Sequence, residues 1–342
     1  MTTKVLVVDD SALVRLTLQN VLSKEPDIEV VGTAPDPFVA RDKIVELEPD
    51  VLTLDIEMPG MDGITFLRKL MKFYPLPVIV VSSHSEPGSE RAFDALDAGA
   101  LDVIRKSGPG FSLAEMCSQL VEKIRELAQA RIRVVSETQA TFGGLKKVAS
   151  LNGGDNGKII AIGASTGGTK ALEVVLGSFP RNAPGTVVVQ HMPPSFTASF
   201  AKRLNKVCEI EVREAGDRET LVPGVALIAA GGRHMVLSRE HDKVIAMLKD
   251  GPRVHKHKPS VEMLFKSVAS AIGGNALGVL LTGMGVDGAN GLLEMRRRGA
   301  HTIAQDEESC VVYGMPKAAV QRGAACEVLS LGQIADSLMA HV

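Results

Sequence analysis

The chain has 342 residues, and 45% of them are hydrophobic, which is enough to fill the cores of two domains of ordinary size. Its formal net charge of −2 excludes a strongly basic protein, so we expect no nucleic-acid partner. No apolar run is long enough to cross a bilayer, and acidic residues interrupt the first apolar run, so we expect neither membrane insertion nor a signal peptide. The cysteines are few and widely spaced, which indicates reduced thiols in a cytoplasmic protein.

The first part of the sequence alternates short apolar runs with helical patterns. Such alternation is typical of a parallel, doubly wound α/β sheet, and we assign it to a first domain over residues 1–128. Helices are expected at about 12–22, 37–47 and 113–127. The expected strands are Lys4–Val8, Ile28–Val31, Val51–Leu54, Val78–Val81 and Asp102–Arg105.

Chemically active side chains follow the strands of this first domain, at Asp9, Asp10, Asp55, Ser82 and Lys106. The carboxyl ends of parallel strands meet at one edge of a sheet, so these side chains should lie together. Clustered carboxylates repel one another unless a cation joins them, and oxygen ligands favour Mg²⁺. A carboxylate beside Mg²⁺ and a lysine can accept a phosphoryl group. The alternative is that the aspartates only cap a helix and a turn.

The motifs VLVVDDS, LTLDIEMPGMDG and VSS, together with Lys106, resemble those of a response-regulator receiver domain. The resemblance implies a flavodoxin-like fold with Asp55 as the phospho-acceptor. It also implies that Asp9 and Asp10 form the Mg²⁺ pocket with Asp55, and that Ser82 and Lys106 sense the phosphate.

Two positions depart from the usual receiver pattern. Ser107 stands where receivers often have proline, and Val103 stands at the position of the aromatic switch residue. The route by which phosphorylation changes the surface should therefore differ from that of the simplest receivers.

Residues 129–157 are polar and rich in glycine, which predicts a flexible connection. The remaining residues, 158–342, again alternate apolar runs with helical patterns, and they predict a second, Rossmann-like parallel domain. A hairpin is expected at 234–237 and 243–247, and helices at about 195–204, 261–271 and 289–298. The expected strands are 159–162, 186–190, the stretch within 222–232, 278–282 and 302–305.

The second domain begins with an apolar run that leads into Ser165 and the flexible pair Gly167–Gly168, followed by a helical pattern. A strand, a tight turn and a helix start place a serine hydroxyl beside free backbone N–H groups, and the spacing satisfies G-x-S-x-G. A bland small-residue turn or a phosphate-binding loop would leave the same pattern.

Three expected strand ends in this domain carry Ser165, His191 and Asp287. A histidine base can activate a serine nucleophile, and an aspartate can orient the histidine. The chain order Ser, His, Asp differs from that of α/β-hydrolases, which disfavours that fold. Taken singly, His191 would be a polar strand-end residue and Asp287 a turn residue.

The motifs GASTGG, VVVQHMP, SFAKRLN, HKPSVEMLF, LLTGMGVDGA and AQDEESCVVYGMPKAA resemble the catalytic domain of the CheB family, the chemotaxis response-regulator protein-glutamate methylesterases. The resemblance implies Ser165 as nucleophile, His191 as base and Asp287 as its partner. It also implies an oxyanion site formed by backbone N–H groups near Thr166 and Met284. Departures from the family pattern are Leu227, Ala230 and Glu262, which bear on the substrate groove.

The same resemblance implies the reaction and the partners. The substrates would be γ-glutamyl methyl esters of methyl-accepting chemotaxis receptors, hydrolysed to methanol without a cofactor, with deamidation of specific receptor glutamines as a further activity. A histidine kinase of the chemotaxis type would be the phosphodonor. It also implies inhibition by an unphosphorylated receiver, which we picture as packed over the Ser165 groove.

Three rival hypotheses remain open at this point: a phospho-switched scaffold without chemistry, a DNA-binding output domain, and a nucleotide-binding second domain. The second domain is long for a helix-turn-helix and carries no basic recognition helix. No ribose-binding acid follows GASTGG at the expected distance. The spacing of His234, His255, His257 and His301 predicts no zinc site, and HKHK at residues 255–258 is interpreted as a solvated loop.

Overall fold

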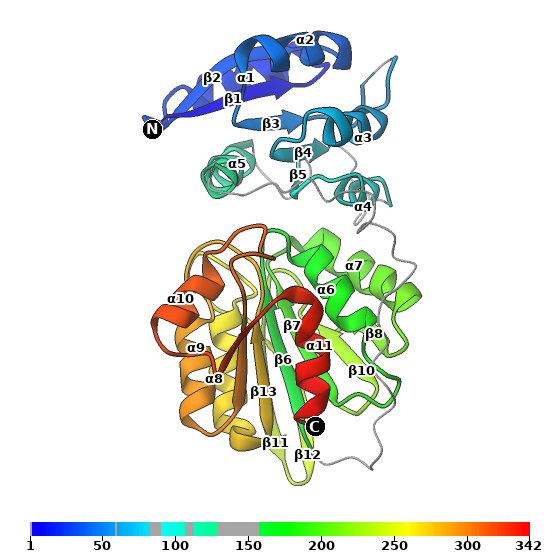
Figure 1. Ribbon diagram of the computed structural model, residues 1–342, viewed down its shortest axis with the longest axis vertical. Helices are drawn as coiled ribbons and strands as arrows, with labels where there is room; N and C mark the ends of the chain where they lie inside the picture. Colours follow the sequence, from blue (N-terminus) through cyan, green and yellow to red (C-terminus); the bar gives the residue numbers. More distant parts are fainter. Residues whose placement is uncertain (1, 59, 83–89, 107–112, 129–156) are drawn as a thin grey trace. The chain divides into compact units, whose positions relative to one another are not determined.

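The computed structural model describes residues 2–58, 60–82, 90–106, 113–128 and 157–342 (Figure 1). The chain divides into two compact units, residues 1–138 and 139–342, which are described separately below. The predicted connection at 129–157 lies, apart from Gly157, outside the described residues, as does Ser107.

The first unit is built on a five-stranded sheet in the order β2-β1-β3-β4-β5, in which every neighbouring pair is parallel. This is the flavodoxin-like order, and it reverses direction between β1 and β3. The predicted parallel α/β fold is thus confirmed. The strands are β1 Thr3–Val8, β2 Ile28–Ala34, β3 Val51–Leu54, β4 Val78–Ser82 and β5 Asp102–Arg105.

Apolar side chains on both faces of this sheet are covered by helices. On one face Leu18 and Leu22 of α1 (Ala12–Leu22) join Leu120 and Ile124 of α5 (Leu113–Leu127) in a core with β1. The other helices are α2 Pro37–Leu47, α3 Gly63–Phe73 and α4 Glu90–Asp97. The helix α2 begins where the sequence predicts, because the Asp36 side chain accepts from two backbone N–H groups and proline occupies the first turn.

The second unit is built on a seven-stranded parallel sheet in the order β15-β14-β13-β6-β7-β10-β8. From β6 the chain moves outward in one direction through β7, and later returns to β13 on the other side of β6. The switch point between β6 and β13 is where such sheets place their ligand crevice. The strands are β6 Ile159–Ala164, β7 Gly185–Gln190, β8 Glu211–Glu214, β10 Val225–Ile228, β13 Ala276–Leu280, β14 His301–Gln305 and β15 Glu327–Leu329.

Helices cover both faces of this second sheet, with α8, α9 and α10 on one side and α6, α7 and α11 on the other (Figure 1). This doubly wound arrangement confirms the predicted Rossmann-like class. The helices are α6 Gly168–Gly177, α7 Pro194–Val207, α8 Val261–Ala271, α9 Ala289–Arg297, α10 Met315–Gln321 and α11 Leu331–Ala340, with a short 3₁₀ helix, η1, at Gly273–Asn275.

A separate three-stranded antiparallel sheet joins the predicted hairpin, β11 His234–Glu240 and β12 Lys243–Lys249, to the short β9 Glu219–Thr220. Its apolar face packs under α8, where Met235 and Leu248 share a core with Phe265. The hairpin therefore packs against α8, and the amino end of α8 contributes to the site described next.

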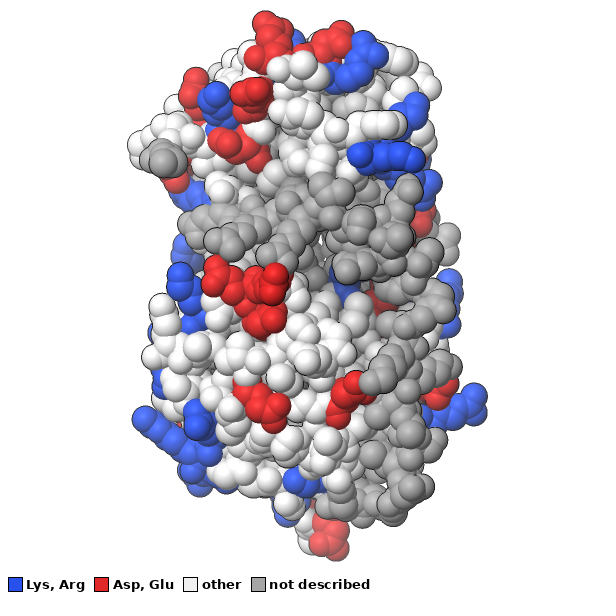
Figure 2. All heavy atoms as spheres, viewed as in Figure 1, with Lys and Arg blue, Asp and Glu red and all other residues white. Residues whose placement is uncertain are grey.

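Within the described parts of the chain, the helices include none long and apolar enough to span a membrane. On the face drawn in Figure 2, the described Lys and Arg side chains are scattered among Asp and Glu rather than gathered into one continuous basic surface.

Candidate active site

Ser165 lies in the tight loop between β6 and α6, at the carboxyl end of the central strand. Its backbone N–H donates to the carbonyl of Thr282 at 3.0 Å, and its own carbonyl accepts from Gly168 N–H at 2.7 Å. A Cβ on Gly168 would lie 2.1 Å from Oε1 of Gln190, and Gly167 has a φ of +78°. The glycine pair is therefore required by a left-handed turn and by close packing against β7.

His191 follows β7, and its backbone N–H donates to the carbonyl of Ala164, so the two loops run side by side. Its Nε2 lies 2.8 Å from Oδ2 of Asp287, and its side chain is only 4% exposed. Its Nδ1 is buried and has no hydrogen-bond partner among the residues that the structure describes. Because Asp287 holds the proton on Nε2, Nδ1 keeps a lone pair and can act as a base.

Asp287 is buried at the amino end of α8, where four groups donate to its carboxylate. Besides His191, these are the Ser260 hydroxyl at 2.8 Å and the backbone N–H groups of Val261 at 2.8 Å and Glu262 at 3.1 Å. Burial raises the pKa of Asp287, but the bonds from His191, Ser260 and Val261 outweigh it and lower the pKa to about 2. Asp287 lies in a turn, as the simpler interpretation of the sequence predicts, and its fixed negative charge is also placed to orient His191.

The loop after β13 packs directly against Ser165. The Thr282 hydroxyl donates to the carbonyl of Thr166 at 3.0 Å and accepts from the N–H of Val312 at 3.0 Å. A Cβ on Gly283 would lie 2.6 Å from the Ser165 Cβ, so the backbone of this loop passes directly against the serine. The N–H of Met284, the next residue, donates to no other group in the described part of the chain.

His257 also belongs to this site, since its ring stacks on that of His191 with 3.7 Å between ring centroids and an interplanar angle of 10°. The interpretation of residues 255–258 as a merely solvated loop is therefore wrong for His257. It holds better for His255 and Lys256, which are exposed.

A second cluster lies in the first unit, at the carboxyl ends of β1, β3 and β5. Nζ of Lys106 lies 2.8 Å from Oδ2 of Asp9 and 2.6 Å from Oδ2 of Asp55, and all three residues are buried. Burial raises the pKa of Asp55, although Lys106 opposes the change. Burial lowers the pKa of Lys106, but its bonds to Asp55 and Asp9 outweigh that effect and raise the pKa.

The other predicted residues of this cluster surround the same carboxylates. Asp10 is exposed, and its carboxylate oxygens approach those of Asp9 and Asp55 to within 4.8 Å. Ser82 is buried at the end of β4, and its carbonyl accepts from the N–H of Lys106 at 2.8 Å. This donor set of carboxylate oxygens fits a hard divalent cation such as Mg²⁺. Val103 is buried within β5, two strands from Asp55.

Comparison with known proteins identifies the family of each unit. The family model described as CheB methylesterase matches residues 160–338, and that of the response regulator receiver domain matches residues 5–140. A protein of Syntrophus aciditrophicus named protein-glutamate methylesterase/protein-glutamine glutaminase 2 is 56% identical over 99% of both chains. The chain belongs to the CheB methylesterase family.

Further relatives support that membership of the CheB family. Protein-glutamate methylesterase/protein-glutamine glutaminase 4 of Anaeromyxobacter dehalogenans is 53% identical, over 98% of this chain and 94% of its own. The crystal structure of the Thermotoga maritima CheB methylesterase catalytic domain is 39% identical, with a TM-score of 0.53. That match covers 54% of this chain and 98% of the other. The family joins a receiver domain to a methylesterase domain, and both are present here.

Several residues at this CheB-type site escaped the sequence analysis. Ser260 and Thr282 hold Asp287 and the loop around Ser165, and His257 stacks on His191. Ser260 carried a readable signal, because serine before the apolar run of α8 is a typical N-cap. Thr282 contacts Thr166, and His257 contacts His191, across segments far apart in the chain. No local pattern in the sequence reveals such contacts.

Proposed function

We propose that the enzyme hydrolyses γ-glutamyl methyl esters of chemoreceptor proteins through Ser165, His191 and Asp287. The observation that carries this proposal is the pairing of Nε2 of His191 with the anionic Asp287, which leaves Nδ1 as a buried, unpartnered base. The names of the related proteins support the choice of substrate.

In the first step, Oγ of Ser165 attacks the ester carbonyl while Nδ1 of His191 takes the hydroxyl proton. The proton then passes from His191 to the departing methoxide, which leaves as methanol, and the glutamyl group remains esterified to Ser165. In the second step, water attacks this ester with His191 again as the base. A glutamate side chain and a free Ser165 result.

The oxyanion formed in each step would be held by backbone N–H groups of Thr166 and Met284. This part of the proposal is supported by the path of the Gly283–Met284 backbone against Ser165 and by the Met284 N–H, which is not used within the described residues. Donors fixed before the reaction stabilise the oxyanion without reorganising. The same machinery can release ammonia from a glutamine side chain, which fits the second activity in the relatives' names.

The first unit would control this activity by phosphorylation of Asp55. We propose that a histidine kinase of the chemotaxis type donates the phosphoryl group, with Mg²⁺ held by Asp9, Asp10 and Asp55. Bound Mg²⁺ would offset the charge on the transferred oxygens. Lys106 lies against Asp55 and would pair with the phosphate, while Ser82 would contact it. Unphosphorylated, the receiver would restrict access to Ser165, and phosphorylation would relieve that restriction.

A cytoplasmic location belongs to the same proposal, and it is supported by the four cysteines, all of which are free thiols.

The test of the proposed reaction is methanol release from methylated receptor membranes by the whole chain and by Ser165→Ala. Release by the whole chain alone is expected. Equal release by a folded Ser165→Ala protein would remove Ser165 from the mechanism.

A further inference from the structure

Two histidines and one glutamate converge at the amino-terminal edge of the second sheet, at the opposite end from Ser165. His301 begins β14, Glu327 begins β15, and His341 follows the last turn of α11. The parallel pairing of Ile303 with Glu327 brings the two strand starts together. The helix α11 packs along β14 and carries His341 back to the same edge.

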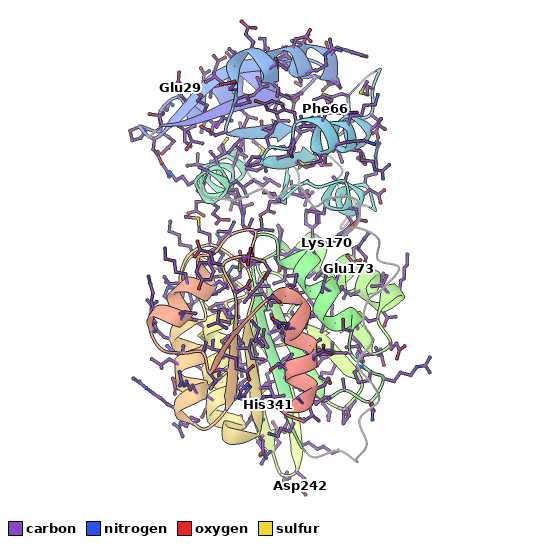
Figure 3. All side chains as sticks on the ribbon, in the orientation of Figure 1. Glu29, Phe66, Lys170, Glu173, Asp242 and His341 are labelled. Atoms are coloured by element: carbon purple, nitrogen blue, oxygen red, sulfur yellow. The ribbon has the colours of Figure 1, made fainter. Side chains whose placement is uncertain are left out.

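The figures place this cluster away from the catalytic end. In Figure 3, His341 is labelled at the carboxyl end of α11, whereas Lys170 and Glu173 mark the first turns of α6, directly after the Ser165 loop. The cluster is therefore separated from the catalytic loops by the length of the strands.

The three side chains lie close enough together to bind one metal ion. Nε2 of His301 is 2.7 Å from Oε1 of Glu327, and Nε2 of His341 is 3.8 Å from the same oxygen. The two imidazole rings stack with 3.7 Å between their centroids. The contact of His301 with Glu327 is thus at ion-pair distance, although Nε2 of His301 does not point squarely at the carboxylate as in a well-aligned hydrogen bond.

Neighbouring groups contact two of the three side chains and set which atoms they present. Nδ1 of His341 lies 2.9 Å from the carbonyl of Ser337, which fixes the ring proton on Nδ1 and leaves the lone pair on Nε2. The hydroxyl of Ser337 donates to Oε2 of Glu327 at 3.2 Å, so one residue orients both ligands.

We propose that His301, Glu327 and His341 bind a zinc ion. Two imidazole nitrogens and one carboxylate oxygen are a common protein set for Zn²⁺, with water as the fourth ligand. Tetrahedral ligands at about 2 Å from zinc lie roughly 3.3 Å from one another. Nε2 of His301 and Oε1 of Glu327, now 2.7 Å apart, must therefore separate slightly, whereas Nε2 of His341, now 3.8 Å from that oxygen, must move closer. The rings must also leave their parallel stack, and His341, whose side chain is 39% exposed at the end of its helix, must rotate relative to the Ser337 carbonyl that its Nδ1 contacts.

Two charges near the site act in opposite directions. Lys158 lies near enough to His301 to disfavour a further positive charge there, and it opposes a cation. The carboxylate of Glu327 supplies the offsetting negative charge directly among the ligand atoms. Another group with metal-ligand spacing, His255, Glu262 and Asp287, is less suited, because the Asp287 carboxylate already accepts from four donors.

A zinc ion at this position would tie α11 to the edge of the sheet. It would stabilise the fold of the second unit without touching Ser165, His191 or Asp287. The zinc-free chain should therefore hydrolyse esters at the same rate but unfold at a lower temperature.

The test uses the full-length protein, stripped with a chelator and kept in millimolar Mg²⁺ to fill the acidic pocket of the first unit. Zn²⁺ alone is titrated by calorimetry into the wild type, His341→Ala and Glu327→Gln. The wild type should bind one more Zn²⁺ than either variant, or bind it at least about tenfold more tightly. Stoichiometric Zn²⁺ should raise its melting temperature but not theirs.

The matched control is His241→Asn, which removes an exposed histidine at the tip of the β11–β12 hairpin. Asparagine suits the positive φ of 54° at that position. This control should bind zinc as the wild type does. Equal zinc binding and equal thermal shifts in the wild type and in His341→Ala would overturn the proposal, as would the absence of zinc binding by the wild type.

Discussion

Nε2 of His191 lies 2.8 Å from Oδ2 of Asp287, and this contact determines which imidazole nitrogen remains available as a base. With the proton held on Nε2, the base must be Nδ1, which is buried and has no partner in the described part of the chain. The amino end of α8 holds the aspartate, and the hairpin under α8 supports that helix. The geometry of the proposed triad thus depends on a helix that donates no reacting group.

The stacking of His257 on His191 should contribute to the rate by holding the catalytic ring in place. Aromatic pairs contribute about 0.5–1.5 kcal/mol beyond the area that they bury. His257→Ala should therefore lower kcat by up to about tenfold. His257→Phe keeps an aromatic ring and serves as the control. A kcat for His257→Ala equal to that of the wild type would show that the stack has no part in positioning the ring.

The low pKa of Asp287 predicts how the stability of the second unit depends on pH. In the folded chain the pKa falls from an ordinary 3.8 to about 2. The folded state therefore binds the proton less readily than the unfolded state. The contribution of the Asp287 carboxylate to the stability of the folded state is present above pH 4 and is lost as the pH falls from about 4 to about 2. The lower pKa of Asp287 in the folded chain corresponds to about 2–3 kcal/mol in the free energy of unfolding.

The tyrosine content of the chain supplies a reporter for this measurement. The chain has two tyrosines and no tryptophan, so Tyr74→Phe leaves Tyr313 as the sole fluorescent tyrosine, within the second unit. Urea unfolding should be compared at pH 5 and pH 3, with and without Asp287→Asn. The loss of stability between the two pH values should be smaller in the asparagine variant. Identical losses would show that Asp287 does not carry the effect.

Many helix and strand limits could be predicted because their signals are local. Asp36 and Pro37 mark the start of α2, and the predicted ranges of α5 and α8 match the structure. The strands β8, β9 and β15 were missed, since they are short and lack an apolar run. The strand β13 begins and ends two residues earlier than predicted, which places Thr282 in the site loop.

The candidate site residues were predictable because each follows a strand that the sequence marks clearly. The contacts that set their chemistry were not, since they join distant segments: Ser260 with Asp287, or His257 with His191. The zinc ligands escaped for the same reason. His341 lies 40 residues from His301, as 341 − 301 gives, so no local pattern links the two.

Gly283 should tolerate no side chain, because a Cβ there would lie 2.6 Å from both the Ser165 Cβ and Sδ of Met315. The loop would have to move away from Ser165 and take the Met284 N–H with it. Gly283→Ala should lower kcat by roughly a hundredfold, the loss typical of removing one oxyanion donor. The control is Gly332→Ala, where nothing lies within 4 Å. Its activity should be unchanged, whereas an equally active Gly283→Ala protein would exclude a close role for this loop.

Phosphorylation of the first unit should require a divalent cation and Asp55. Labelling by a small phosphodonor should fall to background in excess EDTA and return with Mg²⁺, since the clustered carboxylates need a cation. Asp10→Asn should weaken Mg²⁺ binding and so raise the Mg²⁺ concentration needed for labelling, because Asp10 contributes an oxygen atom to the same cluster. Labelling that continues unchanged in EDTA would show that the cluster holds no metal ion.

The consequence for regulation can be measured with the same phosphodonor. Methanol release by the whole chain should increase on phosphorylation, and Asp55→Asn should abolish the increase without lowering the basal rate. An increase that persists in Asp55→Asn would place the phospho-acceptor elsewhere.

We propose that Ser165, His191 and Asp287 act as one catalytic unit, and a comparison of single and double variants shows whether they do. Methanol release should be measured for Ser165→Ala, for Asp287→Asn and for the two changes together. Asp287→Asn alone should cost on the order of 10⁴ in kcat. If the residues act as a unit, the double variant will be no slower than Ser165→Ala alone. Losses that multiply in the double variant would contradict the account, because Asp287 would then act independently of the serine.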